Sequence, residues 1–124
     1  MAFTSPEESP ANFAAAFNAG DRAAIIDFYE PGAMLIVEPG QPVTGHEAIG
    51  AVIDGFLATS DKISVTPSYC YVNGDMALTS LAWSLAGKDA DGKPVDLGSG
   101  NTAEVMRRQP DGSWRYILDN GAAG

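Results

Sequence analysis

Cysteine and histidine are almost absent from this chain of 124 residues, which contains Cys70 and His46 and no other residue of either type. A single cysteine excludes an internal disulfide. Structural zinc sites are built from clusters of cysteine and histidine, so these counts argue against one. Cys70 lies in an apolar stretch and is most simply a small buried residue. We therefore expect no metal centre, and the carboxylate chemistry considered below needs no cofactor.

Basic residues are also scarce, with 7 Lys and Arg against 16 Asp and Glu and a net charge of −9. Nucleic acids and anionic membrane surfaces are bound through patches of lysine and arginine, so the composition argues against both partners. No stretch approaches the roughly 18 apolar residues of a membrane span. The first ten residues, MAFTSPEESP, lack the basic and then apolar pattern of a signal peptide. We expect a soluble, cytoplasmic protein.

The residues that are present fit a globular protein. Hydrophobic residues make up 45% and charged residues 19% of the chain, and the length suits one domain over residues 1–124. Helical signals fill the first half of the chain, and strand signals fill the second. This order predicts the α+β class.

Two helices are predicted near the start of the chain. A Ser-Pro pair at positions 9 and 10 is an N-cap followed by a first-turn proline, so the first helix is expected from about Pro10 to Ala19. Asp21 can cap a second helix that includes Tyr29 and ends before Pro31.

A third helix is predicted after residue 44. Thr44 and Glu47 have the spacing of a capping box. The residues that follow place one apolar stripe at helical spacing, which predicts a face turned toward a core. The stripe consists of Ile49, Val52, Ile53 and Phe56.

Strand signals begin with AMLIVE at 33–38 and dominate from residue 62 onward. Pro67 interrupts one run and predicts an edge strand or a bulge. Asn73 and Gly74 form a strong hairpin signal, and two further turns are expected within 89–94 and 109–112. Consecutive hairpins predict a largely antiparallel sheet, and the three helices can cover one of its faces.

The last predicted hairpin, EVMRRQPDGSWRYILDN at 104–120, carries Glu104 near one end and Asp119 near the other. A two-residue turn at Asp111 and Gly112 would place the two acids opposite each other on one face. A three-residue loop that begins at Pro110 would shift the pairing by one, so the acids would point to opposite faces. The Pro-Asp-Gly sequence favours the three-residue loop. A bulge within the strands can restore the shared face.

Three stretches resemble the SnoaL-like and ketosteroid-isomerase-like branch of the nuclear transport factor 2-like superfamily: AAFNAGDRAAIIDFYEPGAMLI, PVTGHEAI and DGKPVDLGSGNTAEVMRRQPDGSWRYILDN. The resemblance covers about residues 9–120. It implies a cone, in which a strongly curved sheet wraps around the helices and leaves a pocket at its open end. It also implies a homodimer formed through the sheet, with Trp114 and Tyr116 on a strand near the dimer face. The family contains enzymes and non-catalytic proteins, so the fold alone does not give the function.

The resemblance carries over three candidate catalytic acids. Glu104 falls on the strand acid of the ketosteroid isomerase oxyanion hole, whereas the tyrosine of that site falls on Phe13, which has no hydroxyl. Glu38 lies close to the position of the general base, with a loop that differs by one residue. Asp119 resembles the acid/base residue on the last strand of SnoaL-type cyclases, but no histidine stands beside it.

Two carboxylates in an apolar pocket cannot both ionise cheaply, so one pKa should rise. A neutral Glu104 can then donate a proton, while Asp119 or Glu38 acts as a base next to a carbonyl. The alternative is that these acids lie on a solvated sheet face. The expected pocket lining, which core packing explains equally well, consists of Phe13, Phe17, Met34, Ile36, Phe56, Tyr71, Trp83 and Met106.

Two functions follow from these residues. The first is a cofactor-free isomerase or cyclase, or a hydration enzyme, acting on a small apolar carbonyl compound. The second is a non-catalytic ligand-binding or assembly domain, similar to the association domains of calmodulin-dependent kinases. An acid-lined pocket repels anions, so the expected ligand is neutral or cationic.

Overall fold

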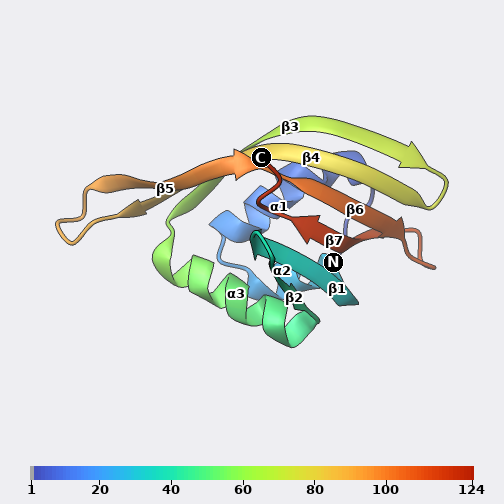
Figure 1. The fold of residues 1–124 in the computed structure, drawn as a ribbon, viewed down its shortest axis with the longest axis horizontal. Helices are drawn as coiled ribbons and strands as arrows, with labels where there is room; N and C mark the ends of the chain where they lie inside the picture. Colours follow the sequence, from blue (N-terminus) through green and yellow to red (C-terminus); the bar gives the residue numbers. More distant parts are fainter. Residues whose placement is uncertain (1) are drawn as a thin grey trace.

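The computed structural model describes residues 2–124 and contains one curved seven-stranded sheet with helices packed against one face (Figure 1). The order of the paired strands is β2-β1-β7-β6-β4-β3, and β5 also pairs with β4. The elements in chain order are the short 3-10 helix η1 (Pro6–Glu8), α1 (Ser9–Asn18), α2 (Arg22–Asp27), β1 (Tyr29–Glu38), β2 (Gln41–Thr44), α3 (His46–Thr59), β3 (Lys62–Asn73), β4 (Met76–Lys88), β5 (Pro94–Asn101), β6 (Ala103–Arg108) and β7 (Trp114–Asn120).

The pairing is antiparallel except between β1 and β7, which run parallel. The α+β class and the largely antiparallel sheet predicted from the sequence are therefore confirmed. Within residues 2–124, no helix is long and apolar enough to cross a membrane.

The first two helices begin close to the predicted positions, but the second ends earlier than predicted. The Asp21 side chain caps α2 by accepting a hydrogen bond of 3.1 Å from the backbone N–H of Ala24. The prediction that Tyr29 lies in this helix is wrong, because β1 begins at Tyr29 and continues past Pro31. The backbone N–H of Tyr116 donates to the carbonyl of Phe28, so pairing with β7 overrides the local helical pattern.

The third helix is found, but its predicted capping box is wrong. Thr44 pairs with Met34 as part of β2, so it does not cap α3. Gly45 occupies the N-cap position with a φ of +92°, a conformation that glycine adopts more readily than other residues. Ile49 and Ile53 of the predicted stripe are buried.

Strand β3 satisfies both expectations for Pro67, because it lies at the edge of the sheet and its register with β4 shifts between Pro67 and Tyr69. The predicted hairpin between β3 and β4 is also present, with Gly74 at a φ of +62°.

The hydrophobic core fills the space between the helices and the inner face of the sheet. Phe3 stacks on Phe28 with ring centroids 4.1 Å apart, and it contacts the edge of Tyr116. Met106, Trp114 and Tyr116 are 0%, 6% and 2% exposed. The prediction that Trp114 and Tyr116 belong to a dimer face is therefore wrong, because both side chains are used in the core of this chain.

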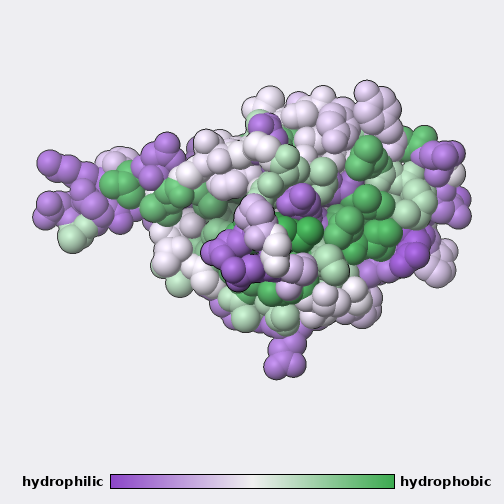
Figure 2. Space-filling model, viewed as in Figure 1, coloured by the Kyte–Doolittle hydropathy of each residue, from purple (hydrophilic) through white to green (hydrophobic). Residues whose placement is uncertain are grey.

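The outer face of the sheet carries a continuous row of apolar residues. The strand registers place Tyr71 opposite Leu78, Leu78 opposite Val105, Val105 opposite Leu118, and Leu118 opposite Met34. We call these five residues the outer apolar row. Tyr71, Leu78 and Leu118 are 67%, 43% and 36% exposed. Figure 2 shows hydrophobic side chains gathered over β4, β6 and β7.

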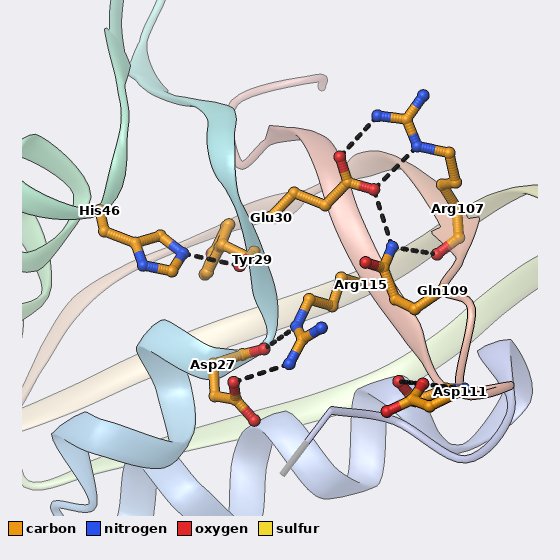
Figure 3. Close-up of polar contacts among 9 residues, drawn as sticks. Asp27, Tyr29, Glu30, His46, Arg107, Gln109, Asp111 and Arg115 are labelled. Atoms are coloured by element: carbon orange, nitrogen blue, oxygen red, sulfur yellow. Dashed lines mark hydrogen bonds and ion pairs between the residues drawn. The ribbon is translucent and has the colours of Figure 1, made fainter.

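Polar contacts hold the start of β1 against the β6–β7 hairpin (Figure 3). Glu30 accepts hydrogen bonds from Arg107 at 2.8 Å and from Gln109 at 2.7 Å. The Nε2 atom of His46 lies 2.7 Å from the backbone carbonyl of Tyr29, and because a carbonyl can only accept, Nε2 carries the proton. These contacts on both sides fix the position of Tyr29.

Candidate active site

The β6–β7 hairpin combines a three-residue loop with a bulge. Gln109 and Ser113 close the loop, in which Gly112 has a φ of +88°. Further along, Met106 pairs with Tyr116 but Val105 pairs with Leu118, so Ile117 is an extra residue in β7. The loop is the one that the Pro-Asp-Gly sequence favours, and the bulge shifts the register back by one residue.

The result is that Glu104 lies directly opposite Asp119 on the inner face of the sheet. The two residues are only 3% and 8% exposed. This arrangement excludes the alternative that the two acids lie on a solvated face. Two acidic side chains placed opposite each other without water are costly to ionise together.

Hydroxyl groups surround both carboxyls. Thr102 Oγ1 donates to Glu104 Oε1 at 2.7 Å, and Thr79 Oγ1 lies 3.3 Å from Oε2. The phenol of Tyr29 donates to Asp119 Oδ2 at 2.6 Å. Each carboxyl therefore has its own donors, supplied by β4 and the β5–β6 junction for Glu104 and by β1 for Asp119.

The surroundings raise the pKa values of the two acids to different extents. Burial raises the pKa of Glu104 to about 8, and the negative charge of Asp119 adds to the rise. Burial also raises the pKa of Asp119, to about 6, while the hydrogen bond from Tyr29 acts in the opposite direction by stabilising the carboxylate. Between these two values Asp119 is ionised and Glu104 is neutral. Burial holds the pKa of Tyr29 well above its ordinary value, so its phenol keeps the proton that it donates.

The acid pair opens onto a cavity of about 430 Å³ between the inner face of the sheet and helices α1 and α3. Its walls are mostly apolar. The lining residues are Phe13, Phe17, Tyr29, Leu35, Val37, Ile53, Phe56, Ile63, Val65, Leu81, Trp83, Leu85, Leu97, Ser99, Gly100, Thr102, Glu104, Tyr116, Asp119, Gly121, Ala122 and Gly124.

Four of the eight residues expected to line a pocket line this cavity, namely Phe13, Phe17, Phe56 and Trp83. The other four do not. Leu35 pairs with Asp119 and faces inward, so its neighbours Met34 and Ile36 point the other way. Tyr71 is on the outer face, and Met106 is enclosed in the core.

Glu38 lies apart from the acid pair. It is exposed, and it follows a register shift between Ile36 and itself at the end of β1. It borders a second hollow of about 450 Å³ between the β1–β2 hairpin and α3. Glu38 is not among the residues that line the cavity of the acid pair, so the geometry does not support it as a base for this site.

Sequence reasoning missed Tyr29, Tyr116, Thr79 and Thr102, which all surround the acids. Tyr29 was assigned to a helix, and Tyr116 to a dimer face. The phenol of Tyr29 enters the site from β1 and donates to Asp119, so it does not replace the oxyanion-hole hydroxyl that is missing at Phe13. A usable signal was the pair of alternating positions Thr102 and Glu104, because residues two apart on a strand share a face.

Trp83 forms one wall of the cavity, and its ring lies against strand β5. Its partner in the register is Gly100, where an added Cβ would lie only 3.1 Å from the indole ring. The indole N–H donates to the carbonyl of Gly121 at 3.1 Å. The absence of a side chain at Gly100 therefore makes room for the ring. Across residues 2–124, no three His, Cys, Asp or Glu side chains are grouped so that they could hold a metal ion.

Solved structures with similar folds come from several bacteria. A ketosteroid isomerase-like protein from Erwinia carotovora atroseptica matches with a TM-score of 0.77 and 19% identity, over 92% of this chain and 89% of that one. A nuclear transport factor 2-like protein with a cystatin-like fold from Novosphingobium aromaticivorans matches with a TM-score of 0.74 and 21% identity, over 94% and 79%. A protein of unknown function from Mycobacterium tuberculosis matches with a TM-score of 0.77 and 22% identity, over 89% of this chain but only 64% of that chain.

These identities are low, so the structures support the fold and not a shared activity. No curated protein matches the chain. A family model described as the SnoaL-like domain matches residues 11–117, which is most of the chain. The chain therefore belongs to the SnoaL-like family.

Proposed function

We propose that the cavity is the active site of an enzyme that isomerises, cyclises or hydrates a small apolar carbonyl compound by acid–base chemistry. The observation that carries this proposal is the direct pairing of two buried acids, Glu104 and Asp119, at an apolar cavity. Perturbed carboxyl groups in a cleft are typical of catalytic sites.

The two acids have different roles in this mechanism. Near neutral pH, ionised Asp119 removes a proton from the carbon next to the substrate carbonyl. Neutral Glu104 donates a hydrogen bond or a proton to the carbonyl oxygen, where negative charge develops. The pKa of about 6 for Asp119 and of about 8 for Glu104 give each group the required protonation state in the same pH range.

Tyr29 acts on the base. Its hydrogen bond of 2.6 Å stabilises the Asp119 carboxylate and orients it. The cavity volume of about 430 Å³ and the apolar walls favour a compact, weakly polar substrate. The negative charge on Asp119 disfavours anionic substrates.

Exchange of carbon-bound hydrogen tests the proposal without knowledge of the natural substrate. Cyclohexanone and beta-tetralone are incubated with the protein in deuterated water at pH 7, and proton NMR follows loss of the hydrogens next to the carbonyl. We expect faster exchange with the wild-type protein, loss of the increase in Asp119→Asn, and a reduction of at least tenfold in Glu104→Gln. Glu38→Gln is the matched control and should keep the wild-type rate. Equal exchange in wild-type and Asp119→Asn would contradict the proposal.

The second candidate function is an assembly domain, which the outer apolar row favours. A row that crosses five strands and leaves Tyr71 and Leu78 67% and 43% exposed is typical of a surface that binds another protein. We propose a second copy of this chain as the partner, in a homodimer formed through the outer face of the sheet. The two functions are compatible, because the cavity and the row lie on opposite faces.

A further inference from the structure

Thr102 lies where strand β4 changes its partner. β4 pairs with β6 over Met76–Thr79 and with β5 over Ala82–Lys88, and Thr102 stands between β5 and β6. The Thr102 backbone N–H donates to the Leu81 carbonyl at 2.9 Å. The Leu81 N–H donates in return to Thr102 Oγ1 at 3.0 Å. The side chain thus replaces a backbone acceptor, which fixes the hydroxyl within the sheet.

The same hydroxyl reaches the acid pair. Thr102 Oγ1 lies 2.7 Å from Glu104 Oε1 and 3.4 Å from the Leu81 carbonyl oxygen. A hydroxyl has one proton to donate, and one of its two acceptor positions is already used by the Leu81 N–H. The Leu81 carbonyl already accepts the Thr102 N–H, and the contact at 3.4 Å is long for a hydroxyl. The Thr102 proton is therefore directed at Oε1.

We propose that Thr102 is a positioning residue that keeps Oε1 of Glu104 as an acceptor, so that the acidic proton is carried on Oε2 and reaches a ligand from that oxygen. This inference rests on the proposed function, in which neutral Glu104 is the proton donor. Thr79 Oγ1 lies 3.3 Å from Oε2, a long contact that leaves the proton available.

The competing arrangement places the proton on Oε1. Glu104 would then donate to Thr102 Oγ1, and the Thr102 hydroxyl would turn toward the Leu81 carbonyl. In that arrangement the Thr102 hydroxyl would give up its hydrogen bond of 2.7 Å to Glu104 Oε1. It would donate instead over 3.4 Å to the Leu81 carbonyl oxygen, which already accepts the Thr102 N–H. The sheet geometry at Thr102 disfavours it.

Variants at and near Thr102 test the inference. Carboxyl-carbon NMR measures the titration midpoint of Glu104 in each variant. Thr102→Val removes the donor to the carboxylate, so the Glu104 midpoint should rise by about one pH unit. Thr102→Ser keeps the hydroxyl, so its Glu104 midpoint should equal that of the wild-type protein. Ser80→Ala is the matched control, because Ser80 Oγ donates its proton to the Thr102 carbonyl at 2.6 Å and not to the Glu104 carboxyl. An unchanged midpoint in Thr102→Val, or an equal rise in Ser80→Ala, would overturn the inference.

A second measurement uses the wild-type protein and does not depend on the folding of a variant. Through-space NMR contacts locate the Thr102 hydroxyl proton at pH values below and above the Glu104 midpoint. We expect contacts with the Glu104 side chain at both pH values. If the proton moves toward Leu81 when Glu104 is protonated, the inference is wrong.

The same titrations separate failure of the inference from failure of the proposed function. A wild-type Glu104 midpoint near the ordinary value of about 4 would contradict both the proposed function and the inference. A raised wild-type midpoint that Thr102→Val leaves unchanged would contradict the inference alone.

Discussion

Tyr29 and Asp119 are 90 positions apart in the sequence, and the phenol of Tyr29 donates a buried hydrogen bond of 2.6 Å to Oδ2 of Asp119. This bond distinguishes the two acids of the site. Both acids have hydroxyl donors, but burial and the charge of Asp119 outweigh those of Glu104 and raise its pKa to about 8, whereas the pKa of Asp119, with the Tyr29 phenol as its donor, rises only to about 6. The two acids can therefore take different protonation states on the same sheet face.

Removal of the Tyr29 hydroxyl should leave less of Asp119 in the ionised form that acts as the base. In Tyr29→Phe the Asp119 carboxylate loses its donor, so the pKa of Asp119 should rise from about 6 by one pH unit or more. The acidic limb of the pH profile of hydrogen exchange should shift to higher pH by the same amount. Carboxyl-carbon NMR measures the pKa of Asp119, and the exchange rate at several pH values gives the profile. Tyr116→Phe is the control, since the Asp119 hydrogen bond comes from Tyr29. An equal shift in both variants would show that lost packing, not the hydrogen bond, is responsible.

Stability should fall as pH rises through the titration of the acid pair. Both acids have a pKa that is higher in the folded chain than the ordinary value, so the folded state binds more protons than the unfolded state between about pH 4 and 8. The contribution of the neutral acids is fully present below pH 4 and is lost as pH rises to 8, a change on the order of a few kcal/mol. Urea unfolding at steps from pH 5 to 9 measures this trend.

Glu104→Gln should flatten that pH dependence, because the amide resembles the neutral acid and cannot ionise. We expect it to be more stable than the wild-type protein at pH 8 and close to it at pH 5. Glu47→Gln, at an exposed acid of α3, should follow the wild-type curve. Parallel curves for Glu104→Gln and the wild-type protein would mean that Glu104 ionises as readily in the folded chain as in water.

The proposed homodimer predicts a sensitive position in the outer apolar row. Leu78 is 43% exposed and lies in the row, between Tyr71 and Val105. Leu78→Lys should convert a dimer into a monomer in sedimentation, with little loss of folded structure. Val72→Lys is the control, since Val72 is 48% exposed on β3 but points to the opposite face from Tyr71. A wild-type protein that sediments as a monomer at millimolar concentration would rule out the dimer.

The position of the Trp83 ring depends on the absence of a side chain at Gly100. A methyl group at this position would meet the indole at 3.1–3.3 Å, so Gly100→Ala should displace the ring into the cavity and weaken its bond to Gly121. We expect a change in tryptophan emission and a loss of stability of about 1–3 kcal/mol. Gly32→Ala, where an added Cβ meets nothing within 4 Å, should leave the emission unchanged. The same emission from both variants would show that the ring does not depend on this space.

The sequence predicted the hairpin loop of the site and allowed a bulge that restores the shared face, but it did not place that bulge at Ile117. Pro110, Asp111 and Gly112 specify the loop through backbone preferences that are local. Ile117 has no such preference, and it is an extra residue only because Tyr116 and Asp119 both have to face inward. The shared face of the acids therefore depended on packing that a local pattern does not contain.

The start of strand β1 also could not be predicted from the local sequence. AMLIVE at 33–38 reads as a strand by composition, and the structure extends that strand back to Tyr29. The extension depends on pairing with Tyr116, which is distant in the sequence, whereas Pro31 argued for a break. This is why the phenol that binds Asp119 was missed although the acid itself was predicted.

The parallel pairing of β1 with β7 has a consequence for the order of folding. A contact between residues 29 and 119 requires closure of a long chain loop, a step that the shorter hairpins do not need. A partly folded chain with its hairpins formed but β1 undocked lacks the Tyr29 bond and admits water to the two carboxyls. We expect the raised Glu104 titration to appear only when β1 docks, and a kinetic refolding experiment can test this order.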